Sequence, residues 1–86
     1  MKQNILITFN NTHSVIQFEK KIKDNNKYDL RLILMPTPRI LSLSCGTCIK
    51  IENIDLKDVL EIIESENLTY KEIYEICKNG YKLFKR

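Results

Sequence analysis

Two cysteines three residues apart are the residues of this sequence whose type and spacing best fit chemistry. The segment Cys45-Gly46-Thr47-Cys48 holds two of the three cysteines in a chain of 86 residues. Thiols this close together can exchange disulfides, hold a metal ion or pass a sulfur atom between proteins. Because the sequence has no Walker loop and no glycine-rich dinucleotide turn, an inference about function begins at these thiols.

A metal site and a thioredoxin-like site are the weaker interpretations of this pair. Structural zinc takes four ligands, so zinc would require a dimer in which each chain donates Cys45 and Cys48. A thioredoxin-like Cys-x-x-Cys motif opens a helix, whereas the residues after Cys48 alternate as in a strand. We therefore expect no metal and no cofactor in the single chain.

Length and composition predict one modest domain without a membrane-spanning segment. The apolar fraction is 43%, and the apolar run at residues 32–35 is far shorter than the roughly 20 residues of a membrane helix. The apolar stretch at residues 5–9 is too short for a signal peptide. Three cysteines are too few for a disulfide scaffold, which favours a reducing, cytoplasmic location.

The net charge of +3 is distributed unevenly along the chain. Residues 77–86 hold four basic and no acidic residues, whereas the rest holds ten basic and eleven acidic residues, a charge of −1. We expect a single α+β domain over residues 1–77 and a basic C-terminal tail over residues 78–86. Such a tail is more often a solvated end than a nucleic-acid or membrane contact, so neither partner is expected.

Apolar spacing predicts the order β-α-β-β-α-β along the chain. Residues 5–9 fit a buried strand, and Thr12 to Asp24 fit a helix with an apolar stripe. The remaining expected elements are strands over residues 30–35, 47–52 and about 70–76, and a helix between Asp55 and Asn67. This order predicts a ferredoxin-like two-layer sandwich, with a four-stranded antiparallel sheet and two helices on one face.

The sheet face opposite the helices would then be bare unless something else covered it. Ile33 and Met35 are expected on that face, opposite the leucines of the same strand. Apolar side chains there indicate a partner surface, with a homodimer through this face as one interpretation. Cover by Tyr81, Leu83 and Phe84 of the tail is the other.

The predicted topology places one cysteine of the pair in an electropositive corner. The first two strands run parallel, so the turn at residues 10–13 and the loop at residues 36–46 should meet at one edge of the sheet. Cys45 is then expected beside a helix N-terminus, His13 and Arg39. A helix N-terminus and a cation both favour the thiolate, and His13 is a candidate proton shuttle.

The residues around Cys45 are expected to differ in role. Gly46 lacks a side chain and leaves room for another molecule to approach. Cys48 should face away from the helices, and Cys77 should lie at the opposite edge, out of reach of the pair. Cysteines often only pack, which is the preferred interpretation of Cys77. A histidine in the first turn of a helix is more often an ordinary surface residue than a proton shuttle, which is the other interpretation of His13.

Four segments of the chain, taken together and in order, resemble a known family. They are Ile5-Leu6-Ile7-Thr8-Phe9, Asn11-Thr12-His13, Met35-Pro36-Thr37-Pro38-Arg39 and Ser42-Leu43-Ser44-Cys45-Gly46. Over roughly residues 4–76 the chain resembles the small bacterial family described as "Putative Se/S carrier protein-like". The Pro-Thr-Pro-Arg loop followed by Ser-x-Ser-Cys-Gly is the most specific part of this resemblance.

The resemblance implies a carrier of sulfur or selenium rather than an enzyme. Cys45 would hold a persulfide or selenopersulfide whose anion is stabilised by Arg39 and the helix N-terminus, and the partners would be proteins that donate and accept the atom. The family pattern centres on one cysteine, so Cys48 would be a local addition, a resolving thiol that releases sulfide or selenide. Two alternatives remain open: a thiol–disulfide module using both cysteines, and a non-catalytic interaction domain.

Overall fold

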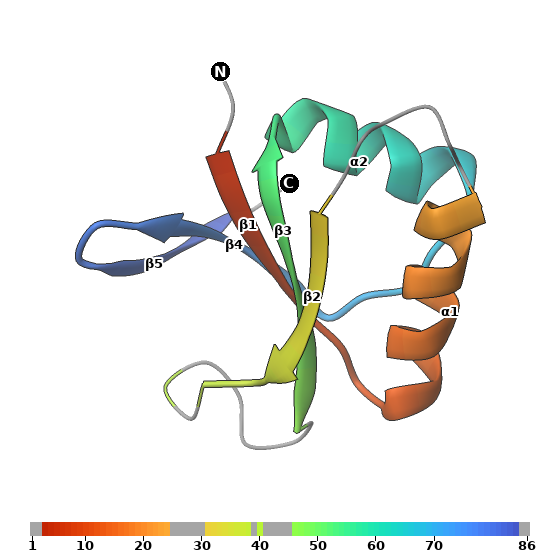
Figure 1. The fold of residues 1–86 in the computed structure, drawn as a ribbon, viewed down its shortest axis with the longest axis horizontal. Helices are drawn as coiled ribbons and strands as arrows, with labels where there is room; N and C mark the ends of the chain where they lie inside the picture. Colours follow the sequence, from red (N-terminus) through yellow and green to blue (C-terminus); the bar gives the residue numbers. More distant parts are fainter. Residues whose placement is uncertain (1–2, 25–30, 39, 41–45, 85–86) are drawn as a thin grey trace.

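The computed structural model describes residues 3–24, 31–38, 40 and 46–84. Its elements are β1 (Gln3–Thr8), α1 (Thr12–Asp24), β2 (Arg31–Pro36), β3 (Thr47–Ile54), α2 (Leu56–Ser65), β4 (Glu72–Cys77) and β5 (Gly80–Phe84) (Figure 1). The predicted α+β class and the predicted order are confirmed as far as β4. One further strand follows.

The sheet has five strands within the described residues, so the prediction of four is wrong. Their order is β2-β3-β1-β4-β5, and every neighbouring pair is antiparallel. The additional strand β5 comes from the basic tail, which turns at residues 78–79 and pairs with β4 instead of crossing the sheet. Its alternation of Tyr81 and Leu83 with Lys82 is a strand pattern that the high charge of the segment obscured.

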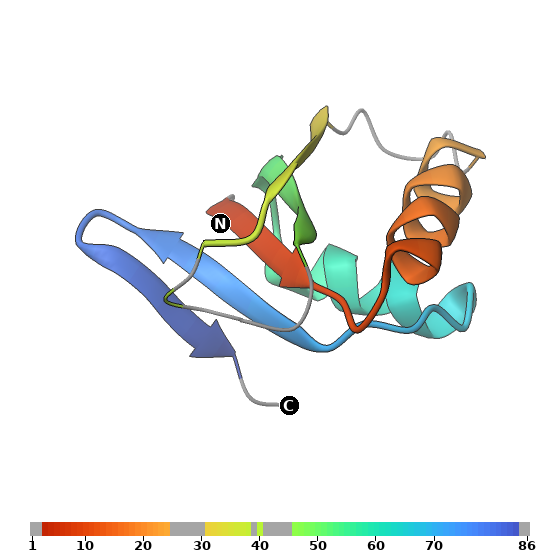
Figure 2. The same cartoon turned by 90° about the horizontal axis from the view of Figure 1, so that it is seen from below.

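Both helices lie on the same face of the sheet, as predicted (Figures 1 and 2). Apolar stripes of the two helices pack on the inward side chains of β1, β3 and β4 to form the main core. The helix residues in this core are Val15, Phe18, Ile22, Val59, Ile62 and Ile63. Among the described residues, no helix is long and apolar enough to cross a membrane.

Local polar groups set the ends of the helices. The side-chain oxygen of Asn11 accepts a hydrogen bond from the Ser14 backbone N–H at 2.8 Å, which caps the start of α1. After α2, Asn67 adopts a left-handed backbone with φ of 52°. The N–H of Leu68 then donates to the carbonyl of Ile63 at 3.0 Å. The predicted start of α1 and the terminating role of Asn67 are both confirmed.

The face opposite the helices carries a second, smaller cluster. Leu6 and Cys48 are 0% exposed and Tyr74 is 7% exposed, and Met35 packs against them. Two side chains with no exposed area must be covered by the same chain, so the centre of this face is not bare. The predicted direction of Met35 is confirmed.

Candidate functional site

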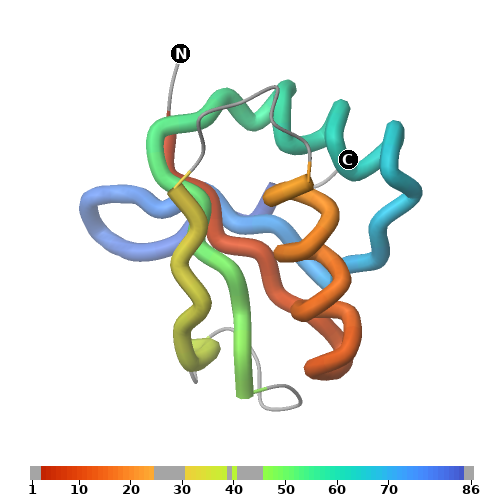
Figure 3. Tube along the Cα trace, turned by 45° about the vertical axis from the view of Figure 1, so that its right-hand side comes forward, coloured from red at the N-terminus to blue at the C-terminus, as the bar shows by residue number. Residues whose placement is uncertain are grey.

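The candidate site lies where β1 and β2 end and β3 begins. Cys48, near the start of β3, pairs with Thr8 of β1 on one side and with Met35 of β2 on the other. β1 and β2 therefore run parallel, and their C-terminal ends lie on the same side of the sheet. Figure 3 shows these strand ends together with the start of α1 at one end of the molecule. The prediction that β1 and β2 run parallel and end on the same side is confirmed, whereas most of the loop at residues 36–46 lies outside the described residues.

Cys48 faces away from the helices, as predicted, and its side chain is fully buried. The thiol lies beside Leu6 and Tyr74, and its Sγ is 3.9 Å from the carbonyl oxygen of Pro36, to which it donates. In this conformation Cys48 fills space in the sheet and is closed to another protein.

The base of the loop between β2 and β3 is joined by a backbone hydrogen bond. The N–H of Thr37 donates to the carbonyl oxygen of Gly46 at 3.0 Å. Gly46 is exposed, and a Cβ atom built there would meet no atom of the described residues within 4 Å. The hydroxyl oxygen of Thr37 is buried without a hydrogen-bond partner among the described residues. The base of this loop therefore has room beside Gly46 and, on Thr37, a buried hydroxyl without a partner among the described residues.

Three hydrogen-bonded polar residues lie next to Cys48 on the sheet face opposite the helices. The Thr8 hydroxyl accepts from the Glu72 N–H at 3.1 Å and lies 3.4 Å from the Glu72 carbonyl. The Tyr74 hydroxyl donates to the Glu72 carboxylate at 2.9 Å. Burial, followed by the hydrogen bond to Glu72 and its charge, raises the pKa of Tyr74. The phenol is thus a neutral donor at physiological pH.

Neither Tyr74 nor Glu72 nor Thr8 stands out in the sequence as a candidate for chemistry. Glu72 and Tyr74 are two apart in a strand, which places them on one face. That spacing was visible in the sequence. The contact with Thr8 was not, because it depends on the register between β1 and β4.

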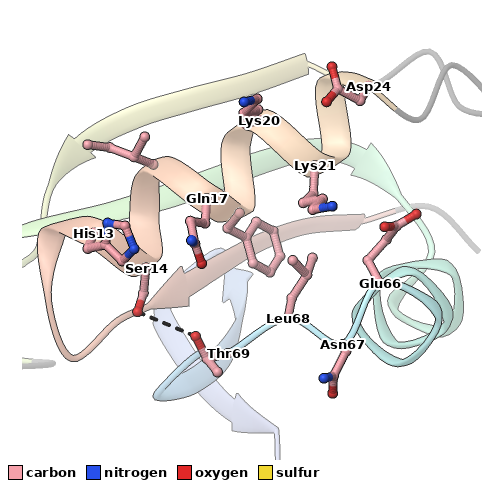
Figure 4. A pocket seen from close by; sticks show the side chains of 12 residues that line it. His13, Ser14, Gln17, Lys20, Lys21, Asp24, Glu66, Asn67, Leu68 and Thr69 are labelled. Carbon is pink, nitrogen blue, oxygen red and sulfur yellow. Dashed lines mark hydrogen bonds between the residues drawn. The ribbon is translucent and has the colours of Figure 1, made fainter.

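His13 lies in the first turn of α1 and is exposed. It stands at one end of a pocket of about 610 Å³ between α1 and residues 66–69. Figure 4 shows Ser14 and Thr69 bridging this end of the pocket, with their hydroxyl oxygens 3.4 Å apart. The pairing of His13 with Cys45 stays a prediction, because Cys45 and Arg39 lie outside the described residues.

Cys77 is the last residue of β4. Glu72, the first residue of the same strand, pairs with Thr8 beside the candidate site. It is therefore far from the candidate site along the strand, as predicted. It is also exposed, with its Sγ 3.7 Å from the Glu75 carbonyl, so the interpretation of Cys77 as a packing residue is wrong. The reason is its place at the hairpin turn, beyond the cover of the helices.

Within the described part of the chain, no three His, Cys, Asp or Glu side chains gather into a metal site. The family model described as "Putative Se/S carrier protein-like" matches residues 4–75. The chain belongs to this family. Neither the curated proteins nor the solved structures gave a match. The segment matched to the Se/S carrier protein-like family includes the cysteine pair and ends inside β4, so β5 lies outside it.

Proposed function

We propose that this protein carries a sulfur or selenium atom on Cys45 and delivers it to another protein. Membership of the Se/S carrier protein-like family is the observation that supports this function most strongly. The matched region contains two cysteines, and one of them, Cys48, is fully buried in the sheet. Its packing role favours Cys45 as the working thiol.

The proposed loading step is a thiol–persulfide exchange. The Cys45 thiolate attacks the outer sulfur of a donor persulfide, a new S–S bond forms, and the donor leaves as a thiolate. No external oxidant or reductant is consumed, because one S–S bond replaces another. Arg39 and the N-terminus of α1 would stabilise the anion, and His13 would exchange the proton. Delivery repeats the exchange with a thiolate of the acceptor.

Cys48 has a more limited role in this proposal. As a resolving thiol it would attack the inner sulfur of the loaded Cys45, release hydrogen sulfide or selenide and leave a disulfide that a cellular dithiol reduces. Its burial means that this step first requires Cys48 to leave its place beside Leu6. A single-thiol carrier is therefore favoured over a symmetric thiol–disulfide module.

Mass spectrometry tests the carrier function directly. The full chain is incubated with a cysteine desulfurase and cysteine, and Cys45 should gain about 32 Da, or about 80 Da with selenocysteine and its lyase. The Cys45→Ser variant should gain nothing, whereas Cys77→Ser, a matched change of a cysteine far from the site, should load normally. Unmodified Cys45 in the wild-type protein would overturn the proposal.

Three finer statements go with this function. We infer that β1 to β4 and the two helices form a ferredoxin-like unit, which the sheet order β2-β3-β1-β4 supports. We propose a cytoplasmic carrier rather than an enzyme, since the proposed chemistry needs a reduced thiol. A homodimer through the face opposite the helices has less apolar surface than expected, because Leu6 and Cys48 are already covered.

A further inference from the structure

We infer that the outer edge of β5 docks an extended, acidic segment of another protein, which adds to the sheet as a further strand. β5 is last in the sheet order, and among the described residues β4 is its one strand neighbour. At such an edge, alternate residues turn their backbone N–H and C=O groups outward, where an incoming strand can pair with them. This inference does not depend on the cargo of Cys45.

The β4–β5 hairpin stands clear of the first helix. Figures 1 and 2 both place its turn at the side of the molecule farthest from α1. Tyr81, Lys82 and Leu83 are exposed, whereas Phe84 is half-buried and packs against the core under the helices. β5 is thus anchored at one end and accessible along its centre.

The opposite edge of the sheet is protected against such pairing. β2 ends at Pro36, which has no N–H to offer, and Arg31 is held by Glu52 with an N–O distance of 3.2 Å. Proline has no N–H to pair with an incoming strand and is a usual means of blunting an edge strand, whereas the charge of Lys82 on β5 restricts pairing to a strand of opposite charge. β5 contains no proline, so of the two edges it is the one suited to accept a strand.

The positive charge of β5 and its surroundings indicates which kind of strand would bind there. Residues 77–86 contain four basic and no acidic residues, and Lys82 is the central residue of β5. Two copies of β5 pairing antiparallel about their centres would set Lys82 opposite Lys82, which like-charge repulsion disfavours. Glu75 of β4 lies opposite Lys82 on the inner side, and an acidic residue of the incoming strand would flank it on the outer side. An acidic strand therefore fits better than a second copy.

The apolar residues of β5 define the rest of the pattern. Leu83 pairs with Tyr74 and Tyr81 pairs with Ile76, so all four lie on the face opposite the helices. An incoming strand that alternates acidic and β-branched residues places its acids beside Lys82 and its apolar side chains beside Tyr81 and Leu83. Because β5 lies outside the family match, this edge suits a partner particular to this chain.

A peptide titration followed by NMR tests the inference on the ¹⁵N-labelled full chain. The probe is a Val-Glu-Val-Glu-Val peptide flanked by Gly-Ser, and its counterpart replaces each Glu by Lys. The acidic peptide should shift the amide signals of residues 80–84 and leave those of residues 31–35 unchanged. Lys82→Glu should weaken this binding about tenfold at low salt and allow the basic peptide to bind.

Controls separate docking from general charge attraction and from misfolding. Lys20→Glu makes the same charge change on the exposed side of α1 and should leave the affinity unchanged. Lys82→Gln removes the charge without reversing it and should give an intermediate loss, while unchanged signals elsewhere show that each variant folds. Equal binding of both peptides, shifts at β2, no binding, or a wild-type dimer that buries β5 would each overturn the inference.

Discussion

Alkylation should separate the cysteines by burial, with Cys48 reacting at least a hundredfold more slowly than Cys77. Cys48 is 0% exposed, whereas Cys77 is exposed at the hairpin turn. For Cys48 to react, its side chain must leave its place against Met35, and the hydrogen bond between Thr37 and Gly46 must open. The exposed Cys77 needs no such opening and serves as an internal reference.

The size of the effect follows from the cost of this opening. Breaking the backbone hydrogen bond costs about 1 kcal/mol, and returning each of the Cys48 and Met35 side chains to water costs about 1 kcal/mol more. A total of about 3 kcal/mol leaves roughly one molecule in 150 open, which slows labelling of Cys48 by the same factor. Global unfolding costs about 5 kcal/mol or more, so local opening sets the rate.

A time course with iodoacetamide, followed by trypsin and mass spectrometry, measures these rates. Cys45 and Cys48 share the tryptic peptide 40–50, whereas Cys77 lies in peptide 72–78, so fragment spectra must locate the label within the first peptide. In denaturant all three thiols should react at similar rates. Labelling of native Cys48 within tenfold of Cys77 would refute the reasoning and favour the two-thiol redox module.

Three substitutions and one control substitution test the fold by urea unfolding. Tyr74→Phe should lower the free energy of unfolding by about 1 kcal/mol at neutral pH. Because the pKa of Tyr74 is raised in the folded protein, the phenol's contribution is complete below about pH 10 and is lost as the pH rises through the raised pKa, so the difference from wild type should shrink there. Asn11→Ala removes the cap of α1 and should cost about 1 kcal/mol; an unchanged midpoint would contradict the capping role. Phe18→Ala should cost about 3 to 5 kcal/mol, whereas Ile16→Ala, exposed on the same helix, should change stability by about 0.5 kcal/mol or less.

The elements that the sequence predicted well are those whose apolar periodicity is local. Helix α1 begins and ends at the predicted residues, Thr12 and Asp24, because its cap and its apolar stripe both lie within the segment. β5 was missed because its basic residues suggested a solvated tail. Its apolar residues become a strand only through pairing with β4, and Phe84 also reaches the core under the helices.

At the candidate site, the direction of the Cys48 side chain was predictable from the sequence, whereas its degree of burial was not. Alternation along β3 placed Cys48 on the face away from the helices, and the structure confirms this direction. Its complete burial depends on packing with Leu6, Tyr74 and Met35, which are distant in sequence, and no local pattern reports this. The link between Glu72 and Thr8 likewise depends on the register of β1 against β4. The placement of Cys45 and Arg39 beside the start of α1 stays a prediction, because both lie outside the described residues.

A carrier must hold its partner while its thiol stays accessible, and the sheet order allows this. The proposed docking edge on β5 is separated from β3 by β4 and β1, so three strand spacings of about 4.8 Å place the edge about 14 Å from the column of Cys48. The cysteine loop leaves the sheet from β2 and β3, on the other side of β1. A strand docked on β5 therefore lies away from the ends of β2 and β3, while a partner domain about 30 Å across can still reach them. The charged hairpin and the thiol loop can thus serve one partner at the same time.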